Sequence, residues 1–267
     1  MMALDYPALL RDLKYETDLL VDYLSCSAEL AWDAKTPADG WAIRDQVSHL
    51  AYFDDCAHLA LTDAGRFRVE ADRLMALGPD FPDRVAEAHR HMSPRELLNW
   101  FDESRSRLLT AFDTEDPRRR LPWFGPDMSA ASSATARLME TWAHGQDIYD
   151  ALGVEHPLSP GLRNIAHLGV STFAFAHRLN NLEVPTEPVR VELDASESDG
   201  VWTWGPADAE NRVTGPAEDF VLVVTQRRHP DDTKLNIIGT VARVWMSIAQ
   251  AFAGAPGTGR PSRTGAC

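Results

Sequence analysis

The sequence has few cysteines and few basic residues, and each shortage excludes a class of protein. Its three cysteines, Cys26, Cys56 and Cys267, do not fit a disulfide framework or a cysteine-based metal site. The 26 lysines and arginines are outnumbered by 40 aspartates and glutamates, which gives a formal net charge of −14. Because nucleic-acid backbones and anionic membrane surfaces repel such a chain, we expect neither as its main partner.

Long hydrophobic runs are also missing. The longest unbroken apolar run, 220–224, is far shorter than the roughly 20 residues that a membrane-spanning helix needs. The N-terminus shows no basic segment followed by an apolar core, so we expect no signal peptide. With 44% hydrophobic and 25% charged residues, the composition is that of a globular protein. These features predict a cytoplasmic protein with a small-molecule partner, and they leave its oligomeric state open.

The first part of the chain carries helical patterns. Leucines recur at helical spacing from Leu9 to Leu24, and Ser93 followed by Pro94 and Glu96 is a typical helix start. Residues 63–92 look polar and irregular, apart from a short helix at 83–91. Gly153 is expected to end the helix that contains Glu140. We therefore predict an antiparallel four-helix bundle, followed by a fifth helix, with helices at about 7–32, 42–62, 94–113 and 160–181 and one that begins after a cap at Ser129 or Ser132 and ends before Gly153.

The composition changes after Pro185, where apolar and polar residues alternate in short segments bounded by glycines. The pattern predicts strands at 188–193, 201–204, 212–214 and 235–238, and a helix at 241–252. Residues 217–228 are ambiguous, because valines favour a strand while Pro216 and Glu218 favour a helix start. The fold class is α+β, with a helical domain at 1–184, a small α+β domain at 185–254 and a disordered tail at 255–267.

Glu140 and His144 stand four residues apart, so they share one face of the predicted helix. Neighbouring apolar residues such as Leu138 and Trp142 indicate that much of this helix is buried. A buried carboxylate and imidazole need a partner, and a divalent metal is one. A solvated face or a simple hydrogen-bonded pair remains the alternative.

His49 lies on the predicted second helix, one turn after Asp45. From the residues alone, a core histidine that bonds to Asp45 or to a backbone carbonyl is the competing interpretation.

The segment Thr36-Pro37…Gly40-Trp41 through His49-Leu50 resembles the Gly-Trp-x-x-x-Asp-x-x-x-His-Leu signature of the DinB-like superfamily. More narrowly, it is similar to the mycothiol-dependent maleylpyruvate isomerase family of actinobacteria. The run from Arg137 to Asp147 resembles an uncharacterised actinobacterial metal-binding subfamily. The segment from Gly215 to Arg228 is similar to a sterol-carrier-like C-terminal domain. The resemblance covers most of residues 1–254.

The resemblance implies that His49, Glu140 and His144 together bind one divalent metal, most often Zn²⁺. Two histidines and one carboxylate leave a coordination position open, as in catalytic zinc sites. Asp45 or Asp147 is a candidate to orient a ligand histidine, or is an ordinary surface carboxylate.

Three functions fit these expectations. The first is a metal-dependent isomerase or thiol transferase that uses mycothiol or a similar thiol on an acidic or electrophilic substrate. In the second, a metal-activated water acts on a secondary metabolite without a thiol. The third is a metal-stabilised protein that binds an apolar ligand and is not an enzyme. In the first, Arg227 or Arg228 is the candidate catalytic residue that binds a substrate carboxylate, unless both are surface arginines.

Overall fold

The computed structural model describes residues 5–195 and 200–263 of the chain. Contacts between residues divide the chain into two compact units, Met1–Gly161 and Leu162–Cys267. The fold is mixed α+β, with helices in both units and the larger sheet in the second unit. In the described parts of the chain, we find no helix with the length and apolar character that crossing a membrane requires.

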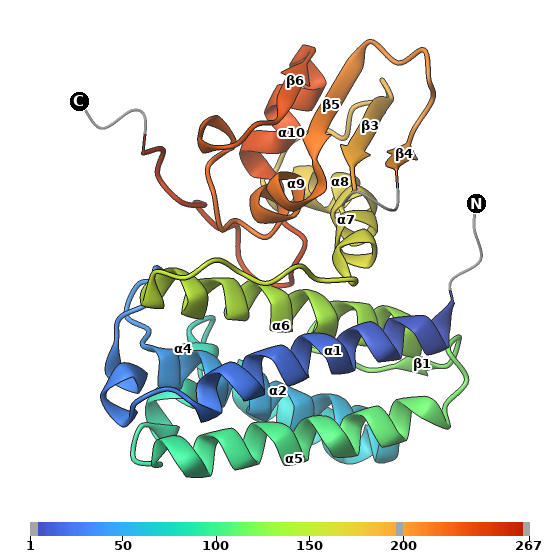
Figure 1. Ribbon diagram of the computed structural model, residues 1–267. Coiled ribbons are helices and arrows are strands. Elements are labelled where there is room, and N and C mark those ends of the chain that lie inside the picture. Colours follow the sequence, from blue (N-terminus) through green and yellow to red (C-terminus); the bar gives the residue numbers. More distant parts are fainter. Residues whose placement is uncertain (1–4, 196–199, 264–267) are drawn as a thin grey trace. The chain divides into compact units, whose positions relative to one another are not determined.

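Four long helices build the first unit and lie side by side in Figure 1. Asp5, Ser93 and Ser129 cap three of these helices through their side chains, as expected from the sequence for Ser93. Gly153 ends the last one in a left-handed conformation with φ of 68°, which confirms the predicted stop. The four helices are α1 (Tyr6–Ser25), α2 (Ile43–Thr62), α5 (Pro94–Asp113) and α6 (Ala130–Leu152).

Two stretches of the first unit differ from the prediction. The first helix ends at Ser25, and only the short 3-10 helix η1 (Glu29–Asp33) follows it where a continuous helix to Trp32 was expected. The stretch 63–92 contains α4 (Phe81–His89), which agrees with the short helix expected at 83–91, and also α3 (Ala64–Met75), which was not expected. Asp63 caps α3, and the buried residues Phe67, Ala71 and Leu74 recur at helical spacing, so the helix has a local cause. A short hairpin, β1 (Arg120–Leu121) and β2 (Met128–Ser129), precedes α6.

A buried ionic cluster ties the four long helices together. The carboxylate of Asp54 on α2 accepts hydrogen bonds from Arg105 on α5, at 2.8 and 3.0 Å, and from Arg137 on α6, at 2.8 Å. Arg105 also donates to Thr17 on α1 and to Thr141 on α6. All five side chains are at most 3% exposed, so every charge in this cluster depends on its partners.

The second unit contains helices α7 and α8 and a sheet with the strand order β4-β3-β5-β6. The central pair β3–β5 is parallel, and the two outer pairs are antiparallel. Helices α9 and α10 pack against strands of the sheet, whose buried residues include Val191, Leu193 and Val213. The elements are α7 (Leu162–Ser171), α8 (Phe173–Leu179), β3 (Val189–Asp194), β4 (Val201–Trp204), β5 (Asn211–Pro216), α9 (Ala217–Val224), the 3-10 helix η2 (Pro230–Asp232), β6 (Asn236–Ile238) and α10 (Thr240–Ile248).

The expected fifth helix at 160–181 is two helices, α7 and α8, which are interrupted at Thr172. Both pack in the second unit, α7 against α9 and α8 against α10. For this reason the division between the units falls after Gly161, whereas the sequence placed it after residue 184. The described part of the expected tail, 255–263, forms no helix or strand, but the backbone N–H groups of Gly257 and Arg263 donate to Gln250 and Asp232. Residues 264–267 lie outside the described residues.

Candidate metal centre

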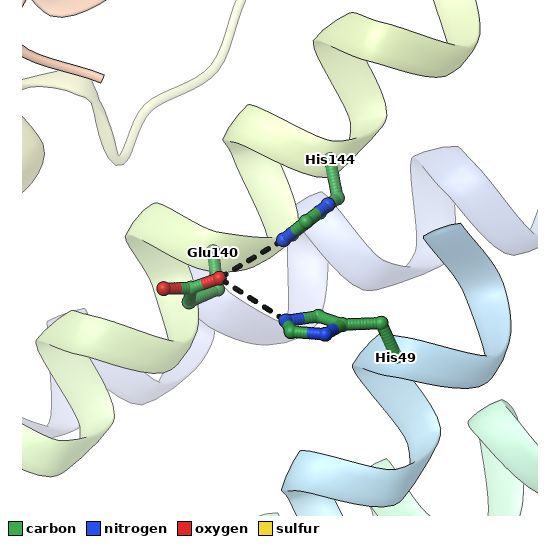
Figure 2. Close-up of side chains that lie close together, drawn as sticks. All are labelled: His49, Glu140 and His144. Atoms are coloured by element: carbon green, nitrogen blue, oxygen red, sulfur yellow. Dashed lines mark hydrogen bonds and ion pairs between the residues drawn. The ribbon is translucent and has the colours of Figure 1, made fainter. Parts of the chain in front are cut away.

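The three predicted metal ligands come together in the first unit. His49 lies on α2, and Glu140 and His144 lie one turn apart on α6, which packs against α2. Their side chains converge on one point in Figure 2, with the Nε2 atoms of both histidines directed at the Glu140 carboxylate. The side chains of His49, Glu140 and His144 are 13%, 22% and 11% exposed, respectively. The group is therefore largely shielded but keeps an accessible edge at Glu140.

The spacing of the donor atoms suits a tetrahedral ion. Glu140 Oε2 lies 3.0 Å from His144 Nε2 and 3.6 Å from His49 Nε2, and all three donor atoms lie within 4.8 Å of one another. Donors that bind zinc tetrahedrally at about 2.0–2.1 Å are themselves about 3.3 Å apart. The two measured separations bracket this value, so the donor set fits a zinc ion.

The surroundings of His49 and Glu140 keep both side chains in the protonation state that binds a metal at neutral pH. Burial, reinforced by the neighbouring His144, lowers the pKa of His49 to about 4, so its ring is neutral. Burial alone would raise the pKa of Glu140, but the interactions with His144 and His49 outweigh it and hold that pKa well below its usual range. An ionised carboxylate next to a neutral imidazole is what a divalent cation requires.

Gln46 fixes the orientation of His144. The Oε1 atom of Gln46 accepts a hydrogen bond from His144 Nδ1, while its Nε2 donates to Thr36 Oγ1 at 2.8 Å. Thr36 in turn donates to the backbone carbonyl of Trp41 at 2.9 Å. These hydrogen bonds favour the tautomer with the ring proton on Nδ1, in which Nε2, 3.0 Å from Glu140 Oε2, offers its lone pair to a metal.

Asp45 does not orient a ligand, in contrast to one of the two expectations from the sequence. Its carboxylate accepts from the backbone N–H of Ala42 at 2.8 Å and pairs with Arg90 at 2.9 Å, so it caps α2. Asp147, the other candidate, is fully buried on α6. Gln46 was not predicted as a site residue. Its position in the apolar stripe of Ile43, Val47 and Leu50 was the signal that could have indicated a buried polar side chain with a partner.

The predicted arginines lie in the second unit, directly after α9. Arg227 donates to the backbone carbonyl of Thr225 at 2.7 Å, and Arg228 donates to that of Arg227 at 2.8 Å. Both are half-buried, and their role in a site remains a prediction. Cys56 is buried, and burial raises the pKa of its thiol to about 12, which makes it a poor nucleophile.

Comparisons with known proteins show the family and the fold of the chain. Residues 10–149 match the model of the mycothiol maleylpyruvate isomerase N-terminal domain, and residues 185–236 match a model described as wyosine base formation. Two uncharacterised proteins of Mycobacterium tuberculosis, from two strains, are each 47% identical over 93% of this chain and 96% of their own length.

Two solved structures share the fold. The crystal structure of a mycothiol-dependent maleylpyruvate isomerase has a TM-score of 0.61, and that of a histidine-to-alanine mutant has a TM-score of 0.62. Each is 17% identical and covers 88% of this chain and 96% of its own. The domain match and the close relatives together place the chain in the family of the mycothiol maleylpyruvate isomerase N-terminal domain.

Proposed function

We propose that the chain is a metal-dependent enzyme that uses a low-molecular-weight thiol, such as mycothiol, to isomerise or to modify a small electrophilic molecule. The convergence of His49, Glu140 and His144 on one point with an accessible edge is the observation that carries the proposal. The solved isomerases of similar fold are described as mycothiol-dependent, which supports the choice of thiol. The four long helices would be a DinB-like antiparallel bundle, and the second unit would be sterol-carrier-like.

Zn²⁺ is the metal that this donor set favours, and when bound it would supply a positive centre that stabilises a thiolate at neutral pH. Glu140 and the two histidines hold the ion, and together they contribute a charge of −1. Gln46 keeps His144 in the binding tautomer. Burial raises the pKa of the Cys56 thiol, which argues against this buried thiol as the nucleophile and favours a sulfur supplied by a cofactor.

An isomerisation by such a thiolate balances without an oxidant. The sulfur adds to an activated alkene, forming a C–S bond and turning the double bond into a single bond. Rotation about that bond and expulsion of the thiolate break the C–S bond and restore the alkene with the opposite geometry. If expulsion does not follow and the adduct takes up a proton, the product is the thioether of a thiol transfer. Arg227 and Arg228 are the candidates to bind a carboxylate of the substrate.

Calorimetry of the zinc-loaded protein against mycothiol tests the proposal, with glutathione as the comparison thiol. We expect one equivalent of zinc and zinc-dependent binding of mycothiol. His144→Ala should lose both, because two remaining ligands hold the ion poorly. The matched control is His91→Ala, since His91 is exposed and lies outside the ligand set.

Equal trace zinc in wild type and His144→Ala would contradict the metal centre itself. Zinc binding without heat from either thiol would instead favour the thiol-independent metal enzyme or the non-enzymatic ligand-binding protein. The two results are separable because the zinc content is measured before any thiol is added.

A further inference from the structure

The metal centre is flanked by aromatic rings. The Trp41 ring stacks on His144, with ring centroids 5.9 Å apart and planes inclined by 16°, and lies 5.2 Å from the His49 ring. Phe53, one turn after His49 on α2, lies 4.5 Å from the His49 ring. Trp41 is held from the other side, because its indole N–H donates to Asp83 on α4 at 2.7 Å. Two ligand rings are therefore in contact with fixed aromatic side chains.

The aromatic side chains continue away from the centre. Phe53 contacts Phe124 at 5.6 Å, Phe81 at 6.2 Å and Trp123 at 6.5 Å, measured between ring centroids. We call Trp41, Phe53, Phe81, Trp123 and Phe124 the aromatic band. Its members come from α2, from the residue pair before α2, from α4 and from the loop between β1 and β2.

The outer members of the aromatic band pack against a buried core cluster but are not themselves fully buried. The residues that only fill the interior of this unit, such as Phe101 and Phe112, are completely buried. In the band only Phe53 is buried, while Trp41, Phe81, Trp123 and Phe124 are half-buried, so each residue keeps some accessible surface. Aromatic surface that stays accessible beside a reactive centre is characteristic of ligand sites.

Three arginines around the centre are paired with carboxylates, and Arg137 shares the carboxylate of Asp54 with Arg105. Arg137, whose charge acts on His49, is bound by Asp54 at 2.8 Å. Trp41 also lines a cavity of about 470 Å³, and its two arginines, Arg44 and Arg90, pair with Asp33 and Asp45 at 2.7 and 2.9 Å. Among the described residues, aromatic rings therefore contact both ligand histidines directly.

We infer that the aromatic band binds a flat, apolar group of the substrate, an aryl or extended conjugated group, next to the reacting atoms at the metal centre. The inference rests on the proposed function, because the metal centre has to hold the reacting end. It is compatible with a carboxylate elsewhere on the same substrate. Trp123 and Phe124 are then specificity residues, because their ring contacts are with Phe53, Phe67 and Phe81 and not with the ligands.

A pair of zinc-binding probes tests the inference without any assay of turnover. Acetohydroxamate and biphenyl-4-hydroxamate carry the same metal-binding group, and they differ only in a methyl group against two linked rings. Calorimetry of the zinc-loaded full chain should give the biphenyl compound an affinity at least about tenfold higher than that of acetohydroxamate. Its second ring is long enough to reach beyond Phe53 toward Trp123 and Phe124.

The variants Phe124→Leu and Trp123→Leu test whether the higher affinity for biphenyl-4-hydroxamate comes from contact with these two rings. Each variant should bind one equivalent of zinc and should bind acetohydroxamate as the wild type does, but should lose several-fold of the preference for biphenyl. The matched control is Trp100→Phe, whose ring contacts are with Tyr52 and His89 and which should keep the full preference. Using two variants keeps the test valid if one of them folds poorly.

Equal affinities for the two probes, or a biphenyl preference that survives both leucine substitutions, would overturn the inference while leaving the metal centre intact. Failure to bind zinc would be seen before any probe is added, and it would overturn the proposed function together with the inference.

Discussion

At the scale of single residues, the position of one proton on His144 decides whether its Nε2 can bind a metal. Gln46 sets that position through its Oε1, and Thr36 sets the orientation of the Gln46 amide in turn. Hydrogen-bond partners of this kind typically change metal affinity by roughly 10–100-fold when they are removed. Of the two histidines, only His144 is oriented in this way, because the buried Nδ1 of His49 has no hydrogen-bond partner among the described residues.

We therefore predict that Gln46→Met lowers zinc affinity by roughly 10–100-fold, whereas Gln46→Glu restores most of it. Methionine fills a similar volume but cannot accept the Nδ1 proton, while glutamate keeps an acceptor at the same distance along the side chain. Competition with a chromophoric chelator measures both affinities. Equal losses in the two variants would mean that Gln46 acts through packing and not through its hydrogen bond.

The sequence predicted the three candidate ligands but not the residue that orients His144. Glu140 and His144 followed from helical spacing, and His49 followed from the family resemblance. Gln46 lies in the apolar stripe of α2, where a polar residue signals a buried partner. Its partner, however, comes from another helix nearly a hundred residues away, and no local pattern reports such a contact. The orientation of Arg227 and Arg228 depends in the same way on contacts that sequence spacing does not encode.

At the scale of elements, helix starts were predictable because their signals are local. Ser93, Pro94 and Glu96 form the expected capping box, with the Ser93 backbone N–H donating to Glu96 at 2.8 Å. The segment 217–224 was ambiguous because its valines favour a strand. It is the helix α9, whose residues from Phe220 to Val224 are all buried. Packing in the interior of the second unit outweighs intrinsic preference there.

The packing of α7 on α9 gives a prediction at this scale. A Cβ atom added to Gly169 on α7 would lie 2.7 Å from Cγ2 of Val224 on α9. Because a valine side chain is stiff, the two helices have to move apart. We expect Gly169→Ala to lower the free energy of unfolding by about 1–3 kcal/mol in urea denaturation. Gly125→Ala, which meets no atom within 4 Å, is the control, and equal stability of the two variants would refute the close contact.

At the scale of the whole molecule, the division into units depends on long-range contacts that sequence patterns do not show. The change in composition at Pro185 is real, but α7 and α8 pack with the elements that follow it. In contrast, residues 153–161, which follow α6, belong to the first unit. There the imidazole of His156 lies 3.2 Å from the buried carboxylate of Glu16 on α1 and packs against the rings of Trp142 and Tyr149.

The division after Gly161 predicts which fragments of the chain fold independently. We expect fragment 1–161 to fold on its own and to bind zinc, since it contains the ligands, the ionic cluster of Asp54 and the His156–Glu16 contact. Fragment 1–184 should also be helical, but its added α7 leaves Ile165 and Ala166 without α9 to cover them, which favours self-association. Fragment 1–152 lacks His156 and should be less stable than 1–161 by about 2 kcal/mol, which lowers Tm by several degrees. Circular dichroism with thermal melting measures all three, and a random-coil spectrum for 1–161 would show that the units do not fold separately.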